Sequence, residues 1–345
     1  MPEIPSVKRL AISQRIEKII DSKEIQQGLQ FVSNIGHISE EVLYNLGIPN
    51  LWLPPIDTSI AEYTKNDFAV LNPLNNKVYS LIQSPQIMKE IAAIAFGSNW
   101  RRTTCFRPEP GDATHAQMFQ QIDVELRNSD GKQARLIASK IFLDVCKKTL
   151  GVSQGIIPEY TYQKLISQYG EDSPNLFLKA NVSNENSTFA YWVTDIPFAN
   201  WDKNGKLKPT HHIMSLPNNA INNPQFSFND YTDEELTHLA CDSYDLVVCN
   251  KNQSIEIAGG DRRISTAKLQ LEAIDRLGEN RQKYAILLQA LEFNETQKIA
   301  KSIAGFAFGI ERLAMILGDI SSIDNIQIFP TNSPTGDFIH TSNNG

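Results

Sequence analysis

The chain has 345 residues, of which 41% are hydrophobic, 21% charged and 9% aromatic, with 18 Gly and 17 Pro. These are ordinary values for a globular protein, and they exclude a disordered chain, a collagen and a coiled coil. The formal net charge is −7, from 32 Lys and Arg against 39 Asp and Glu, and no basic run occurs. This pattern argues against an extended nucleic-acid footprint and a polybasic membrane anchor, although one local surface still suffices to hold a partner.

The N-terminal residues lack the apolar core of a signal peptide, and the most apolar short run, residues 91–96, is too short to span a bilayer. We therefore expect a cytoplasmic protein. The four cysteines have no CxxC or Cys/His ligand spacing, so we expect reduced thiols and no zinc. They are Cys105, Cys146, Cys241 and Cys249. A metal ion, if one is bound, would then be held by carboxylates.

The spacing of apolar residues and the positions of prolines predict the first secondary-structure elements of the chain. Isoleucines at 12, 16, 19 and 20 predict an amphipathic helix within residues 7–29. Residues 33–50 are rich in turn-forming types, so we expect a surface turn there and assign no role to 34–50. Tandem prolines end a short extended piece in 51–57. Residues 67–82 predict two strands around an Asn/Pro turn.

The remaining elements alternate between hairpin-like strands and helices. Residues 103–126 predict two strands joined by a polar loop, and the apolar spacing over 134–145 predicts a helix that covers the sheet. Further strands are predicted at 189–195, 244–249 and 254–260, and helices within 266–292 and 302–317. No repeat or linker divides the chain. We predict one α+β domain over residues 1–345, with a mainly antiparallel sheet and helices outside it.

Charged side chains interrupt the apolar strands. They are Arg107, Glu109, Asp123, Glu125, Asp245, Glu256 and Arg263, with Gln121 beside them. Buried charges are costly unless they are paired or used, so such a cluster on one sheet face is a site hypothesis. The alternative is a solvated outer face, which spacing alone favours because alternation places half of a strand's residues in water. Gln121, Asp123 and Glu125 share one face, which favours the site slightly.

Asp245 and Glu256 become neighbours if 244–258 forms a hairpin, and they would suit a magnesium ion that bridges nucleotide phosphates. They are equally acceptable as surface carboxylates. Gly259 and Gly260 allow close approach of the backbone to a ligand, or a simple bulge. The segment AGFAFG before the last helix is a weak phosphate-loop signal, and the Walker, dinucleotide and GxSxG motifs are absent from the sequence.

Several segments together resemble one known family. The hairpin CFRPE…H…F..QID.E and the later GFAFGIERL resemble motifs two and three of class II aminoacyl-tRNA synthetases, most closely the bacterial aspartyl-tRNA synthetases. LIQSPQIMK, THHIMS, FAYWVTDIPFANWDKNGKLKP and the stretch YDLVV to IEIAGGDRRI resemble further family segments, and SSIDNIQIFP resembles its last strand. The resemblance covers nearly the whole chain in the family's order. Motif one would occupy about 8–57, motif two 101–127 and motif three 303–318.

The resemblance implies a role for each matching residue. Arg107 would hold the α-phosphate and the attacking carboxylate, and Arg312 would be the second catalytic arginine, against adenine and beside the γ-phosphate. ATP would also be bound by Glu109, His115, Phe119 and Glu256, with Asp245 and Glu256 as Mg²⁺ ligands. The side-chain carboxylate of aspartate would lie between Lys89 and Arg263, two cations that would reject asparagine. Glu62, Gln86 and Asp123 would receive its α-amino group, and Ser84, Gln121 and His211 would complete the pocket, although Ser84 and His211 also suit a turn cap and a loop.

The sequence also departs from that family. The motif-one helix begins close to Met1, so the resemblance predicts no OB-fold for the anticodon, and only eleven residues stand where the family carries an inserted domain between motifs two and three. The loop RPEPGDATHAQMF lacks the arginines and acidic residues that the family offers to the tRNA acceptor end. The parts for adenylate chemistry are therefore retained, while those that contact tRNA are reduced.

Three functions remain open on this basis. The first is an ATP-dependent, AMP-forming ligase that activates L-aspartate or a close analogue and transfers the aspartyl group to ammonia, a small amine or a peptide. The second is a truncated enzyme that still charges tRNA. The third is a non-catalytic amino-acid sensor, which would not need the nucleotide, metal and aspartate positions together. We favour the first, and we expect a homodimer through the motif-one helix and the strand near Pro55.

Overall fold

A seven-stranded sheet organises the protein. The computed structural model describes residues 6–57, 68–108, 111–152, 155–180 and 188–330. The strands of this sheet are β4 (Asn99–Phe106), β5 (Met118–Arg127), β6 (Glu159–Thr161), β7 (Phe189–Thr194), β10 (Ser243–Cys249), β11 (Ser254–Arg262) and β12 (Ile303–Gly309). Their order is β4-β5-β12-β11-β10-β7-β6, and β6 runs parallel to β7 while the other neighbouring strands are antiparallel. The predicted α+β class with a mainly antiparallel sheet is confirmed.

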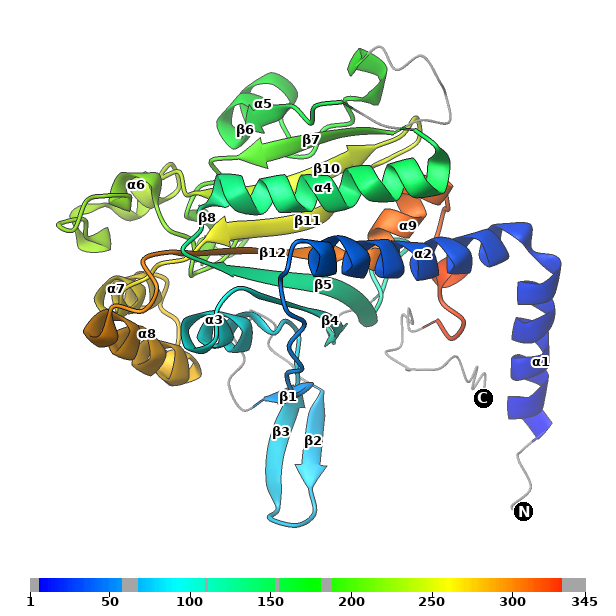
Figure 1. Cartoon of the computed structure of the whole chain (residues 1–345), viewed down its shortest axis with the longest axis horizontal. Helices are drawn as coiled ribbons and strands as arrows, with labels where there is room; N and C mark the ends of the chain where they lie inside the picture. The colour runs from blue at the N-terminus through cyan, green and yellow to red at the C-terminus, as the bar shows by residue number, and fades with distance from the viewer. Residues whose placement is uncertain (1–5, 58–67, 109–110, 153–154, 181–187, 331–345) are drawn as a thin grey trace.

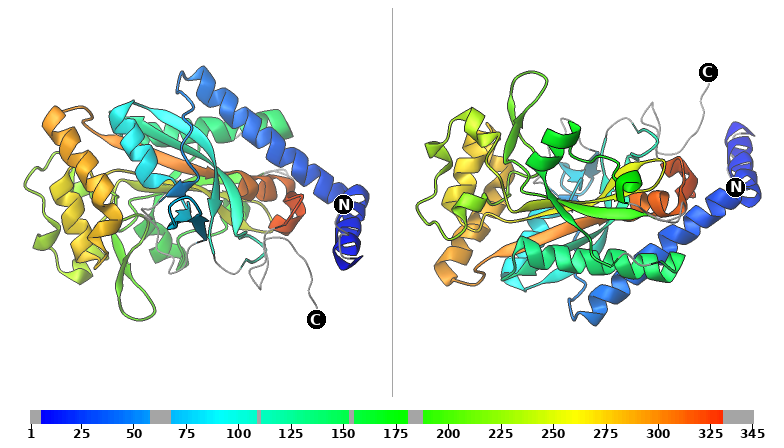
Figure 2. Two further views of the ribbon diagram at one scale, coloured as in Figure 1. Left: turned by 90° about the horizontal axis from the view of Figure 1, so that it is seen from below. Right: turned by 90° about the horizontal axis from the view of Figure 1, so that it is seen from above.

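Three helices cover one face of this sheet. Figures 1 and 2 show α2 (Lys23–Asn45) and α4 (Gly131–Leu150) running side by side across it, with α9 (Ile310–Gly318) next to them. The other α-helices of the described residues are α1 (Ser6–Asp21), α3 (Gln86–Ala95), α5 (Tyr162–Tyr169), α6 (Asp233–Leu236), α7 (Ala267–Arg276) and α8 (Ala285–Gln297). No helix within the described ranges is both long and apolar enough to cross a membrane.

Strand alternation gives the two faces of the sheet opposite characters. On β5, Ile122 and Val124 are fully buried in the core that the sheet shares with α2, α4 and α9. Side chains on a strand alternate between faces, so Gln121, Asp123 and Glu125 point to the opposite face. The sequence places apolar residues on the helix-covered face and polar residues on the other. The functional groups are therefore to be sought on the second face.

Two small sheets complete the fold. The strands β1 (Ile56–Asp57), β2 (Ala69–Asn72) and β3 (Lys77–Leu81) pair in the order β1-β3-β2, and Figure 1 shows this arm projecting from the body. The strands β2 and β3 form the hairpin predicted within 67–82. A second hairpin joins β8 (Ala199–Trp201) to β9 (Leu207–Pro209).

The expectation of a turn over residues 33–50 is wrong, because α2 continues to Asn45. Ile35, Ile38 and Val42 carry on the helical apolar spacing and are buried against the sheet. Gly36 leaves room for Arg102, whose Nη1 would lie 2.7 Å from a Cβ at that position. The glycine therefore serves close packing within the helix and does not end it.

Two further assignments are corrected by the topology. The segment AGFAFG is no phosphate loop, because it forms most of β12, the strand between β5 and β11. The segment 321–330, compared above with a last strand, contains a short 3₁₀ helix (Ile323–Ile326) with Ile323 and Ile326 buried. The sequence of a short segment does not show which strands it will pair with. The order of strands in the sheet depends on segments that are distant in the chain.

Candidate active site

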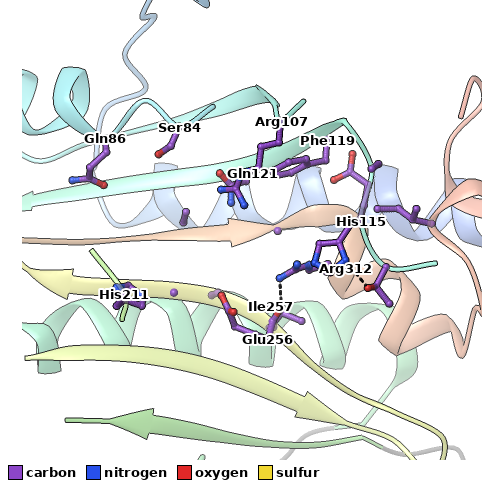
Figure 3. Close-up of a pocket in the computed structure, with 18 of the residues that line it drawn as sticks. Ser84, Gln86, Arg107, His115, Phe119, Gln121, His211, Glu256, Ile257 and Arg312 are labelled. Carbon is purple, nitrogen blue, oxygen red and sulfur yellow. Dashed lines mark hydrogen bonds between the residues drawn. The ribbon is translucent and has the colours of Figure 1, made fainter. Parts of the chain in front are cut away.

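A single cavity on the polar face of the sheet collects most of the predicted site residues. Its wall includes Ser84, Gln86, Lys89, Arg107, His115, Phe119, Gln121, His211, Glu256, Arg263 and Arg312. Figure 3 shows Ser84, Gln86 and His211 toward one end of the cavity, and His115, Phe119 and Arg312 toward the other. Gln121 and Glu256 lie between these ends. The arrangement suits an elongated ligand, or two ligands that meet in the middle.

Small residues in the central strands make room for this cavity. Gly259 on β11 and Ala307 on β12 are cross-strand partners, and both line the cavity together with Gly309. A Cβ on Gly259 would lie 2.7 Å from Oδ1 of Asp245 and 3.2 Å from Oε1 of Glu256. The glycine therefore leaves room for these carboxylates, and close approach of the backbone to a ligand stays a prediction. The irregularity in the β10–β11 pairing lies elsewhere, between Leu246 and Val247.

Buried ion pairs lie under the end of the cavity near Gln86. Nζ of Lys89, on α3, lies 3.5 Å from Oδ1 of Asp123 and 3.3 Å from Oε2 of Glu125, and all three side chains are at most 3% exposed. Arg263 donates two hydrogen bonds to Glu125, Nε to Oε1 at 2.8 Å and Nη2 to Oε2 at 3.1 Å. Arg263 also pairs with Asp261 through Nη1. The interpretation of these charges as a solvated outer face is therefore wrong.

These pairs determine which groups are charged. Burial alone would raise the pKa of Glu125, but Arg263 and Lys89 outweigh it and lower that pKa. Asp261 is likewise held well below its usual pKa, since Arg263, His211 and His212 overcome the effect of its burial. The pKa of Arg263 is raised by Asp261 and Glu125 against its own burial. Both cations predicted to meet a substrate carboxylate are thus fixed in place by protein carboxylates before any substrate binds.

His211 extends the network toward β10. Its Nε2 lies 3.0 Å from Oδ1 of Asp245, and its Nδ1 lies 3.4 Å from Oδ2 of Asp261. Burial would lower the pKa of His211, but Asp245 and Asp261 raise it to about 10, so the ring carries a positive charge at neutral pH. His212 also reaches Asp261, Nδ1 to Oδ2 at 2.9 Å. His211, His212 and Asp261 could together approach a metal ion, but Arg263 and Ser215 already occupy that carboxylate.

Asp245 and Glu256 come together as predicted, on paired strands β10 and β11. Each has an oxygen close to the Cβ position of Gly259. The charge of Asp245 and then burial raise the pKa of Glu256, because two carboxylates repel each other when no cation lies between them. Paired oxygen donors of this kind fit Mg²⁺. They would hold the ion where it neutralises phosphate charge.

The other end of the cavity carries the two arginines and an aromatic ring. The guanidinium of Arg107, just after β4, lies 5.1 Å from the centre of the Phe119 ring. Arg312, in the first turn of α9, donates from Nη1 to the main-chain oxygen of Glu256 at 3.2 Å. The ring of His115 is oriented by Asp112, with Nδ1 2.8 Å from its carboxylate. Two arginines from distant segments therefore face one space, as a polyphosphate would require.

The structure brings most, but not all, of the predicted residues to the cavity wall. Asp123 and Asp245 do not line it, and they contact the lining residues Lys89 and His211 instead. The predicted contact of Asp123 with an α-amino group stays a prediction. Glu62 and Glu109 lie outside the described residues. The four cysteines are buried and form no disulfide, and Sγ of Cys105 donates to Oε1 of Gln121 at 3.1 Å.

Sequence reasoning missed three residues of this site. His212 and Asp261 belong to the network of buried charges. Each lies close in sequence to a predicted residue, because His212 follows His211 and Asp261 lies two residues before Arg263, and this proximity could have identified them. Glu311 lines the cavity and accepts from the main-chain N of Gln120, at 3.0 Å to each carboxylate oxygen. Its burial raises its pKa to about 7. Glu311 directly precedes Arg312 in the segment GIERL, and this position could have identified it from the sequence.

Comparisons with known proteins agree with this fold and cavity. The family of class II tRNA synthetases for D, K and N matches residues 8–333, and the chain belongs to that family. An aspartate–tRNA(Asp/Asn) ligase of Geotalea uraniireducens (strain Rf4) is 22% identical over 442 residues, which cover 89% of this chain and 70% of the relative. This alignment is longer than the 345-residue chain, so the relative has internal segments without a counterpart here.

Solved structures show the same fold. Asparaginyl-tRNA synthetase of Pyrococcus horikoshii, complexed with asparaginyl-adenylate, superposes with a TM-score of 0.72 at 16% identity, covering 96% of this chain and 73% of that one. Aspartyl-tRNA synthetase of Entamoeba histolytica superposes with a TM-score of 0.62 at 16% identity, covering 96% and 63%. At these identities the likeness establishes the architecture, and the ligands of this chain are a separate question.

The packing around Gly259 gives a first prediction. Gly259→Ala should destabilise the protein by about 1–3 kcal/mol, because the added methyl group would lie 2.7 Å from Oδ1 of Asp245 and would force that carboxylate to move. Urea unfolding monitored by circular dichroism measures the change. The matched control is Gly155→Ala, where no atom lies within 4 Å of the added Cβ. Equal stability of the two variants would contradict the packing described here.

Glu90 gives a second prediction, on pH. This residue is fully buried beside Lys89, and its two carboxyl oxygens have no hydrogen-bond partner among the described residues. Burial, and then the charge of Glu125, raise its pKa to about 8. The folded state keeps a proton that the unfolded chain releases near pH 4.5, so this group lowers stability as the pH rises from about 4.5 to about 8.

Glu90→Gln should therefore reduce the loss of unfolding free energy between pH 5 and pH 8. The measurement is urea unfolding at both pH values, with Glu292→Gln on the exposed face of α8 as the control. If Glu90→Gln and the wild type lose the same free energy over this range, Glu90 is not protonated in the folded state.

Proposed function

We propose that this protein activates L-aspartate, or a close analogue, with ATP to form aspartyl-adenylate and pyrophosphate. The observation that carries the proposal is the distribution of cations along one cavity. Lys89 and Arg263 line this cavity and share Glu125 as a buried counter-ion, and Figure 3 shows Arg107 and Arg312 near Phe119. A dicarboxylic amino acid and a nucleoside triphosphate are both anionic, and their reacting groups would meet between these pairs.

The reaction joins two anions, so charge neutralisation and geometry carry most of the catalysis. An oxygen of the substrate carboxylate attacks the α-phosphorus, a new C–O–P link forms, and the bond to the β-phosphate oxygen breaks. Arg107 holds the carboxylate and the α-phosphate together, and Arg312 stabilises the departing pyrophosphate. Adenine lies between Phe119 and Arg312, with Glu109 at its amino group and His115 near the γ-phosphate. Mg²⁺ on Asp245 and Glu256 would offset the remaining phosphate charge.

The amino-acid end supports aspartate over asparagine. The curated relative is named for charging tRNA(Asp/Asn), and the structural relatives are named as aspartyl and asparaginyl enzymes. Here Lys89 and Arg263 both form buried ion pairs with Glu125. A carboxylate accepts from both cations, whereas an amide would turn an NH₂ group toward one of them. Glu62, Gln86 and Asp123 receive the α-amino group, and Ser84, Gln121 and His211 close the pocket.

The second half-reaction transfers the aspartyl group to ammonia, a small amine or a peptide. Two observations favour a small acceptor. In the described part of the loop between β4 and β5, Arg107 and His115 are the only basic side chains, and Arg107 is committed to the first half-reaction. Internal segments of the tRNA-charging relative also have no counterpart. The alternative acceptor is tRNA, which the name of that relative favours. We also propose a homodimer through α2 and the strand near Pro55, for which light scattering should give twice the chain mass.

The first half-reaction is tested by pyrophosphate exchange. With Mg²⁺ and no tRNA, exchange of labelled pyrophosphate into ATP should depend on aspartate, and asparagine should support it at least about tenfold less, because a charged hydrogen bond contributes about 1.5–3 kcal/mol. Arg107→Ala should reduce exchange by about a hundredfold or more, as expected for loss of a group that stabilises developing charge. Lys140→Ala, on the solvent side of α4, is the control. Unchanged exchange in Arg107→Ala would rule out the proposed role.

The acceptor is tested on the same protein with labelled aspartate. Total tRNA should remain unlabelled in acid precipitates, while ammonia or primary amines should yield labelled amide products together with AMP. Labelled tRNA, released as free aspartate by mild base, would instead support the alternative of a tRNA ligase.

A further inference from the structure

Within the part of the chain that the structure describes, Arg101 on β4 is a buried cation without a hydrogen-bonded partner. It is 4% exposed, and Nε, Nη1 and Nη2 all lack a hydrogen-bond acceptor among the residues that the structure describes. The next residue, Arg102, is the opposite case, since it faces outward and contacts Gln120 and Glu40. A buried guanidinium with no acceptor is costly, so its retention calls for a partner.

The register of the sheet places Arg101 in the row next to the cavity. Arg101 lies opposite Asp123, and Thr103 lies opposite Gln121, a residue of the cavity wall. Alternation along β4 puts Arg101 and Thr103 on the same face as these two partners. Arg101 therefore extends the row of polar side chains beneath the cavity from β5 to β4, the strand at the edge of the sheet.

Two polar side chains, one on β4 and one on the helix α3 that packs against β4, also have unused hydrogen-bonding capacity. Oγ1 of Thr103 and Nε2 of Gln86 have no partner in the described part of the chain, and these residues are 6% and 3% exposed. Gln86 is in the first turn of α3 and lines the cavity. Guanidinium, hydroxyl and carboxamide groups all donate hydrogen bonds, so the shared preference of the three is an anion.

The protein's own carboxylates do not meet this need. Asp123 is the carboxylate opposite Arg101, and its nearest cation is Lys89, at 3.5 Å. Glu125 is occupied by Lys89 and Arg263. The charges of Asp123 and Glu125 favour the charged form of Arg101 without a hydrogen bond to it. The effect of burial is larger, so the pKa of Arg101 is lowered. A small anion beside Arg101 would relieve this cost.

We propose that Arg101, Thr103 and Gln86 form a carboxylate-binding subsite that adjoins the aspartate pocket. The inference rests on the proposed aspartate activation, and it adds that one of the substrates carries a further carboxylate. Of the three residues only Gln86 lines the cavity, and Thr103 adjoins it through its cross-strand partner Gln121, which also lines it. The carboxylate belongs either to a substituent on the α-nitrogen of the acid that is activated, or to an amine acceptor such as an amino acid.

Two matched pairs of probes distinguish these sources. The first pair is N-carboxymethyl-L-aspartate and its amide, N-carbamoylmethyl-L-aspartate. The second is glycine and glycinamide, offered to the full chain together with a non-hydrolysable aspartyl-adenylate mimic. In each pair one carboxylate is replaced by an amide of nearly the same shape. Calorimetry measures binding of each probe without requiring turnover.

In one of the two pairs, the wild type should bind the acid at least about tenfold more tightly than the amide, as expected for a charge-assisted hydrogen bond. Arg101→Gln should abolish this preference, and Arg101→Lys should restore part of it. Arg102→Gln, the neighbour on the opposite face, should leave it unchanged. The pair that responds identifies the source of the carboxylate.

No preference in either pair, or a preference that survives Arg101→Gln, would overturn the subsite. That result is separable from failure of the proposed function, because pyrophosphate exchange with aspartate is measured independently. Aspartate-dependent exchange without an Arg101-dependent preference refutes the subsite alone. Loss of exchange with the preference retained refutes aspartate activation alone.

Discussion

The guanidinium of Arg263 is held by two buried carboxylates, Glu125 and Asp261, and the polar face of the sheet depends on these contacts. Removal of a charge from water is costly unless a counter-charge replaces the lost hydration. Each carboxylate therefore brings in a further cation, Lys89 for Glu125 and the two histidines for Asp261. The result is a chain of alternating charges that joins α3, the strands β5 and β11, Arg263 just after β11 and the loop after β9. Loss of any one member would leave its neighbours with fewer counter-charges while they stay buried.

This arrangement is possible because the two faces of the sheet perform different tasks. On one face, α2, α4 and α9 bury the apolar side chains of β5 and β12 in a continuous core. On the other, Gly259, Ala307 and Gly309 contribute little side-chain volume and leave a cavity. The apolar face supplies the burial that stabilises the fold. The polar face can then tolerate repulsion such as that between Asp245 and Glu256, which a bound cation would relieve.

Local patterns predicted the parts that depend on neighbouring residues. The alternation in FQQIDVEL indicated that Gln121, Asp123 and Glu125 share a face, and the hairpin between β10 and β11 brings Asp245 near Glu256 as expected. Prediction failed where distant partners decide. Turn-forming residues in 33–50 did not end α2, because Ile35 and Val42 gain burial against elements more than a hundred residues away. The counter-charge that Glu125 gives to Lys89 and Arg263 was not predicted, because it comes from a distant part of the chain.

The sequence by itself determined the α+β class, the hairpins, most of the residues around the cavity and, through its motifs, the resemblance to the synthetase family. Periodicity and turn chemistry act over a few residues, so they can be recognised without a structure. Only the tertiary structure decided which charges are buried, which of them already pair with one another, and that Arg101 has no partner among the described residues. Ionic contacts depend on distances between segments far apart in the chain, and those distances are set when the sheet assembles.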